Sequence, residues 1–169
     1  MDTLRKKPHQ VPASVPRATS APRKLKIHKS NRVSEKFIEW GKKLSRTAPD
    51  QFIKIIRTGV DAQLIVYASA HYNLPRAEFA KLIGISTATA DRKIKARAKL
   101  EQPQTERLAR IALIENEAAS VFESSESARK WLLQENLAFG GTPISLLDTE
   151  TGAVEVRKVL AAIAYGGVA

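Results

Sequence analysis

Cysteine is absent from this chain of 169 residues, which excludes disulfides and thiolate metal sites. The three histidines, His9, His28 and His71, are scattered, and no pair has the helical spacing of a metal site. No stretch reaches about 18 uninterrupted apolar residues, so we expect no transmembrane helix and no membrane partner. The lack of cysteine fits a reducing compartment, and we expect a cytoplasmic protein.

Signals for export and for catalysis are missing as well. Arg5, Lys6 and Lys7 could open a signal peptide, but Pro8 and Pro12 follow where an apolar run would be required, so we expect no export. No nucleophile, base and orienting group form a recognisable set. We therefore expect no enzymatic activity and no cofactor.

Acidic residues are scarce in the first part of the chain only. The formal net charge is +11. Residues 1–100 hold 22 Lys and Arg against 7 Asp and Glu, whereas residues 101–169 hold 6 against 10. A basic excess of this size usually indicates a polyanionic partner, most often nucleic acid. The asymmetry assigns that partner to the first hundred residues and leaves the rest for another task.

Residues 1–32 are rich in Pro, Ser, Lys and Arg, and their few large aliphatic residues follow no period. This composition predicts a disordered basic arm. The arm is either a solubilising tail or a segment that follows DNA phosphates and raises affinity in a salt-dependent manner.

From residue 33 onward, apolar residues recur at helical spacing and no useful β-alternation appears, so we expect an all-α helical bundle. Pro49, Asp61 and Pro75 mark helix starts, and Gly59 and Asn73 mark helix ends. In the second half we expect a long helix around Leu108–Phe122 and then a helix that is capped by Ser124 and ends at the turn Phe139–Gly141. A short helical turn follows Thr142. The last helix is capped by Thr149 or Thr151, and its apolar stripe consists of Val156, Val159, Leu160 and Ile163.

The segment Pro75–Arg97 predicts a helix-turn-helix. Phe79 and Ile83 are four residues apart and share the buried face of its first helix. Gly84 lies at the turn, where a positive φ costs glycine least. Ser86 is a suitable N-cap for the second helix.

The second helix presents hydroxyl groups followed by basic side chains, as a DNA recognition helix requires. Thr87 and Thr89 can reach phosphates or base edges, and Arg92 can make a bidentate contact to guanine. Asp91 departs from this pattern; it either accepts from cytosine or weakens phosphate binding. A solvated helix hairpin within a bundle is the alternative. The candidate DNA-binding residues are Ser86, Thr87, Thr89, Arg92, Lys93, Lys95 and Arg97.

Spaced motifs in the second half carry a resemblance to a known family. They are Trp131 and Leu132 after Ala128, the turn from Asn136 through Phe139, Gly140 and Gly141 to Pro143, the stretch Leu146–Thr149, Gly152, and Tyr165 with Gly166, while Arg107, Leu108 and Arg110 fit as well. With these motifs, residues 60–169 resemble the Xre/MbcA/ParS-type antitoxins, which join an Xre-like helix-turn-helix to a C-terminal toxin-binding domain.

The resemblance implies an antitoxin of a type II toxin–antitoxin system. The partner would be a RES-domain toxin, an enzyme that consumes NAD⁺, which the antitoxin would block by direct contact. The complex would bind operator DNA and repress its own operon. The toxin-binding residues would be Asn136, Phe139, Gly140, Gly141, Thr149, Arg157, Lys158, Tyr165, Gly166, Gly167, Val168 and Ala169. Because a steric block needs a thin element, we expect the last helix and the tail from Tyr165 to approach the toxin's active site.

The expected organisation is an arm (1–32), a helical DNA-binding region (33–100) and a helical toxin-binding domain (101–169). We expect a homodimer and higher hetero-oligomers with toxin. Its self-association surface would lie around Phe37, Trp40, Phe52 and Ile56, unless these side chains simply form the core. Two other functions stay open, a stand-alone helix-turn-helix transcription regulator and a non-specific nucleoid or RNA-binding protein.

Overall fold

The computed structural model describes the backbone of residues 24–166 and the side chains of residues 32–166. Its elements are α1 (Lys24–Ser45), α2 (Pro49–Thr58), α3 (Gln63–Tyr72), α4 (Arg76–Leu82), α5 (Thr87–Lys95), α6 (Gln102–Val121), α7 (Ser125–Leu133), the 3-10 helix η1 (Pro143–Asp148) and α8 (Glu150–Ala164). The described residues contain no β-strand, only isolated bridges, so the expected all-α class is confirmed. None of these helices is long and apolar enough to cross a membrane.

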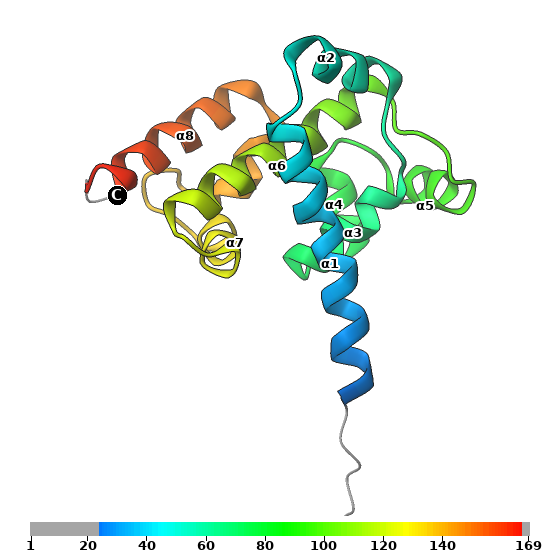
Figure 1. Ribbon diagram of the computed structural model, residues 1–169, viewed down its shortest axis with the longest axis horizontal. Helices are drawn as coiled ribbons and strands as arrows, with labels where there is room; N and C mark the ends of the chain where they lie inside the picture. Colours follow the sequence, from blue (N-terminus) through cyan, green and yellow to red (C-terminus); the bar gives the residue numbers. More distant parts are fainter. Residues whose placement is uncertain (1–23, 167–169) are drawn as a thin grey trace, which may run out of the picture.

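Helix α6 lies at the centre of the molecule and contacts α1, α2, α7, η1 and α8 (Figure 1). A continuous cluster of buried side chains runs from Phe37 on α1 to Leu160 on α8. The recognition helix α5 and the last helix α8 lie at opposite ends of the long axis (Figure 1). The two helices that we expect to meet different partners are therefore separated by the central core.

Several helix boundaries follow from the local signals in the sequence. Gly59 and Asn73 end α2 and α3 with positive φ angles of 78° and 53°. Ser124 and Thr149 cap α7 and α8, and each side chain accepts a hydrogen bond from the backbone N–H three residues on. These caps satisfy groups that a helix end leaves without a partner, as expected from the sequence.

Two expected boundaries are wrong. Helix α1 begins at Lys24 rather than near residue 33, because residues 23–33 contain good helix formers and neither Gly nor Pro. The part of the expected arm in residues 1–23 lies outside the described residues. Helix α7 ends at Leu133 rather than at the turn Phe139–Gly141. A loop follows, and in it the Phe139 ring turns back onto Trp131.

The side chains expected at a self-association surface belong largely to the interior. Phe37 is fully buried and Ile56 is 8% exposed, so both contribute to the core, as the alternative interpretation held. Trp40 and Phe52 are half-buried and pack against the smaller apolar cluster around Leu44. Phe37 and Ile56 are thus not available for contact with a second copy.

A polar cluster is buried between α3 and α6. His71 Nε2 lies 2.9 Å from Glu115 Oε1, and Tyr72 donates its hydroxyl hydrogen to Glu115 Oε2 at 3.0 Å. Burial, then the charge of Glu115 and the hydrogen bond to it, raise the pKa of Tyr72 well above its ordinary value. The three side chains satisfy one another and join α3 to α6.

Candidate functional site

The helices α4 and α5 meet at a tight turn, which confirms the helix-turn-helix expected from the sequence. Gly84 lies at the turn with a φ of 72°, a conformation that favours glycine. A Cβ at Gly84 would collide with the guanidinium of Arg107. Phe79 and Ile83 are fully buried beneath the turn. The turn therefore has both a backbone and a packing reason for its glycine.

The N-terminus of α5 is capped by its own hydroxyl groups. Ser86 Oγ accepts a hydrogen bond from the Thr89 N–H at 3.2 Å and donates one to Thr89 Oγ1 at 2.9 Å. Thr87 is exposed, and its hydroxyl has no partner among the described residues. Ser86 and Thr89 thus position the helix start, whereas Thr87 is free to contact DNA.

The basic side chains of this helix are not equivalent. Arg92, Lys95 and Arg97 are exposed and form no ion pair within the described part of the chain. Lys93 is only 17% exposed; its Nζ donates to the Lys99 carbonyl at 3.1 Å and lies 3.3 Å from Glu101. The expectation that Lys93 points outward is therefore wrong, because its ammonium group is held by the segment that follows the helix.

The acidic residue on the recognition helix has a partner. Asp91 Oδ1 lies 3.2 Å from Arg76 Nη1 on α4, and both side chains are about half exposed. The guanidinium offsets the carboxylate charge that would otherwise repel phosphate. Asp91 therefore interrupts the basic face less than its sequence position indicates.

A groove of about 450 Å³ lies between the loop after α7 and the end of α8. Leu137 beside it is fully exposed, and Tyr165 at the end of α8 is 92% exposed. Large apolar side chains that project next to a groove are typical of an interaction surface. The groove is lined by Trp131, Gln134, Glu135, Asn136, Leu137, Ala138 and Ile163.

The loop that carries Leu137 is held in shape by local hydrogen bonds. The Asn136 N–H donates to the Gly141 carbonyl at 3.0 Å, and Asn136 Oδ1 accepts from the Ala138 N–H at 2.8 Å. The Phe139 ring lies edge-on to Trp131, at a centroid distance of 6.4 Å. With one face of the loop packed inward, Leu137 is left pointing to solvent.

The remaining expected toxin-binding side chains make contacts within the chain, and those of Arg157 and Lys158 stay 37% and 64% exposed. Thr149 caps α8, Arg157 Nε lies 3.1 Å from the Glu117 carboxylate, and Lys158 Nζ lies 2.7 Å from Glu155 Oε1. Gly140 turns the loop with a φ of 64°. Gly166 follows Tyr165 at the end of α8, and residues 167–169 of the expected tail lie outside the described residues.

Comparison with known proteins assigns both halves of this architecture. Residues 51–113 match the model of the antitoxin Xre-like helix-turn-helix domain. Residues 117–166 match the model of the antitoxin Xre/MbcA/ParS C-terminal toxin-binding domain. The chain belongs to the Xre-type antitoxins. Its helix-turn-helix implies binding to DNA, and its C-terminal domain implies a toxin partner.

Curated relatives agree with this assignment. An antitoxin Xre of Photorhabdus laumondii is 23% identical over 114 residues, which span 66% of this chain and 77% of the relative. An antitoxin Xre of Pseudomonas putida is 36% identical over 80 residues, 44% of this chain and 50% of the relative. A protein named Prs ADP-ribosylating antitoxin, from a Sphingobium species, is 29% identical over 138 residues, 76% of this chain and 87% of the relative. Antitoxins of this family are regulatory proteins, not enzymes.

Two features of the antitoxin go beyond what the sequence indicates. Arg107 on α6 donates from Nη1 to the Ile83 carbonyl at 3.3 Å and from Nε to the Asp148 carbonyl at 3.2 Å. A single guanidinium thus joins the turn of the helix-turn-helix to η1. The second feature is the exposed side chain of Leu137. The signal in the sequence that could indicate this exposure is an apolar residue within a glycine-containing turn.

Proposed function

We propose that this antitoxin neutralises a RES-domain toxin, an NAD⁺-consuming enzyme, by direct contact through the surface around Leu137 and Tyr165. Together with the toxin, it binds operator DNA through α5 and represses its own operon. The DNA contacts come from Thr87, Arg92, Lys95 and Arg97 in the main, with Ser86, Thr89 and Lys93 holding the helix in position.

The exposure of Leu137 and Tyr165 carries the toxin half of this proposal. Both lie within the stretch that matches the toxin-binding domain. Exposed large apolar side chains cost solubility and are typically buried by a partner. Asn136, Phe139, Gly140 and Gly141 support the surface by shaping the loop, and we propose that the tail after Tyr165 contacts the toxin as well.

The kind of toxin is supported by the resemblance and by one relative's name. The sequence motifs around Trp131 and the turn Asn136–Pro143 resemble antitoxins whose toxins consume NAD⁺. The name of the Sphingobium relative contains the word ADP-ribosylating. ADP-ribosylation also takes its ADP-ribose group from NAD⁺, so both observations favour a toxin that acts on this cofactor.

The position of the two surfaces supports simultaneous binding. Helix α5 and helix α8 lie at opposite ends of the molecule (Figure 1). Toxin on one end therefore leaves the recognition helix accessible. We expect a homodimer on a palindromic operator, since two recognition helices are needed to read two half-sites.

Co-expression with a RES-domain toxin tests the proposal. Wild-type antitoxin should restore growth and the cellular NAD⁺ level. The variant Leu137→Asp should restore both less fully, because loss of a central apolar contact typically costs about 2 kcal/mol of binding. Ile53→Asp is the matched control, since Ile53 is an exposed apolar residue on α2, far from this surface in the sequence. If wild-type chain binds its operator but never protects cells, the stand-alone regulator is the better account.

A further inference from the structure

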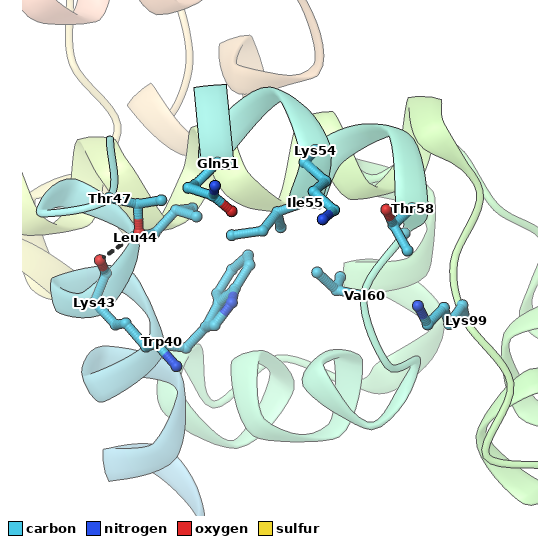
Figure 2. A pocket seen from close by; sticks show the side chains of 11 residues that line it. Trp40, Lys43, Leu44, Thr47, Gln51, Lys54, Ile55, Thr58, Val60 and Lys99 are labelled. Atoms are coloured by element: carbon cyan, nitrogen blue, oxygen red, sulfur yellow. Dashed lines mark hydrogen bonds between the residues drawn. The ribbon is translucent and has the colours of Figure 1, made fainter. Parts of the chain in front are cut away.

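A second cavity, which shares no lining residue with the groove beside Leu137, has no part in the proposed function. It lies between the end of α1, helix α2 and the segment that joins α5 to α6 (Figure 2), and its volume is about 420 Å³. This volume is within the range of natural small-molecule sites.

The inner part of the cavity is apolar. Leu44 is buried, and Trp40, Ile55 and Val60 are half-buried. Figure 2 shows the Trp40 indole extending into the space between Leu44, Ile55 and Val60. An exposed indole edge beside aliphatic groups is suited to a flat apolar group.

The rim of the cavity carries positive charge only. Lys43, Lys54 and Lys99 line it, and its lining contains no acidic residue. Among the described residues, none of these ammonium groups forms an ion pair, and all three side chains are exposed. Three unpaired cations around an apolar floor make a site that favours a compact anion with an apolar body.

We propose that this cavity binds a small amphipathic anion, an aromatic molecule that bears one carboxylate or phosphate group. The aromatic body lies against Trp40, and the anionic group lies between Lys54 and Lys99. The site depends neither on the toxin nor on the identity of the operator, so it can fail or hold independently of the proposed function.

Charge argues against two other occupants. A second copy in a two-fold contact would oppose these lysines to the same lysines, and like charges that face each other oppose association. Residues 1–23 of the chain hold five Lys and Arg against one acidic residue, so this segment is also repelled. A small anion is the occupant that the rim attracts.

The cavity is also connected to the recognition helix. The Leu100 N–H donates to the Val60 carbonyl at 2.8 Å, and the Ala62 N–H donates to the Ala98 carbonyl at 3.0 Å. These bonds join the cavity wall to the segment that leaves α5. A ligand held by Lys99 therefore contacts the same short segment that positions the end of the DNA-binding helix.

Titration of the full chain with naphthoate tests the proposal, with naphthamide as an uncharged probe of the same shape. In a Trp131→Phe background, Trp40 is the only tryptophan, and its fluorescence should change saturably with naphthoate. Naphthamide should bind the parent about tenfold more weakly than naphthoate does. The double variant Lys54→Gln, Lys99→Gln should bind naphthoate about tenfold more weakly than the parent does. Lys42→Gln, on the helix that carries Trp40 but outside the cavity, should bind as the parent does.

Equal affinity for both probes, or affinity that the double variant retains, would overturn the assignment. A sedimentation experiment could also overturn it. If the double variant self-associates more strongly than the parent, and naphthoate dissociates the assembly, the cavity is a contact between copies. The three lysine substitutions are on exposed side chains, so a folding failure will not obscure these outcomes.

Discussion

Arg92 projects from the exposed face of α5 and has no partner among the described residues. If it reads a guanine, Arg92→Ala should cost about 1–3 kcal/mol of operator binding and leave binding to scrambled DNA almost unchanged. Binding assays at two salt concentrations measure this. Arg57→Ala is the matched control for charge, because Arg57 is an exposed arginine on α2. An equal loss on both DNAs would make Arg92 a phosphate contact.

Tyr72 gives the fold a pH dependence of known sign. Burial and Glu115 raise its pKa above the ordinary value of 10.0, so the folded state retains the proton better than the unfolded state. The resulting stability is complete below pH 10 and is lost as the pH rises further toward the folded-state value.

Tyr72→Phe should therefore show a smaller loss of stability above pH 10 than wild type, measured by urea unfolding at pH 8 and above pH 10. At pH 8 the variant should be less stable by about 1 kcal/mol, because Glu115 loses a hydrogen bond. Tyr165→Phe alters an exposed side chain and should follow the wild-type curve. Identical alkaline slopes for Tyr72→Phe and wild type would contradict the assignment.

At the scale of elements, the turn between α4 and α5 depends on a glycine for two reasons. Gly84→Ala should destabilise by about 2–3 kcal/mol, because the positive φ is strained and the new Cβ displaces Arg107. Gly140 has a similar φ of 64°, with no atom near its missing Cβ, so Gly140→Ala should cost only the backbone part, about 1 kcal/mol. Chemical denaturation measures the free energy of unfolding of both variants. Equal losses of stability would show that Arg107 moves aside freely.

The tail after α8 is a separate element to test. Deletion of residues 166–169 should release toxicity in cells that co-express the toxin, since we propose that the tail reaches the toxin's active site. Deletion of residues 1–23, which lie outside both family matches, should leave neutralisation intact. Full protection by the chain without residues 166–169 would show that the surface around Leu137 is sufficient.

Elements governed by neighbours in the sequence could be predicted, and those governed by distant contacts could not. The end of α2 at Gly59 and the caps Ser86 and Thr149 follow from the geometry of single residues. The end of α7 depends on Phe139 folding back onto Trp131, which no local pattern encodes. The same difference between local and distant contacts decides which site residues can be predicted from the sequence.

Arg92 could be identified from its place on an expected helix face. The pattern predicts that Lys93 also contacts DNA, yet its side chain is drawn inward by Glu101 and the Lys99 carbonyl, which lie beyond the helix end. The exposure of Leu137 cannot be predicted from the sequence, because exposure in a loop depends on which neighbouring side chain the fold buries. The sequence thus indicates the kinds of surface better than the individual side chains that form them.

At the scale of the whole molecule, the excess of positive charge and the recognition helix belong to the first hundred residues, and the surface proposed for toxin belongs to the rest. Arg107 spans the two, since its guanidinium binds carbonyls on both sides. Because α5 and α8, which carries the surface proposed for toxin at its end, lie at opposite ends of this joined core (Figure 1), toxin capture and DNA binding should be compatible.

The most direct test combines purified antitoxin, purified RES-domain toxin, NAD⁺ and a fluorescent operator fragment in one solution. NAD⁺ consumption and operator anisotropy are followed together as antitoxin is added. We predict that consumption stops at a fixed stoichiometric ratio and that the inhibited complex remains bound to the operator. Continued NAD⁺ consumption in an excess of operator-competent antitoxin would contradict the account.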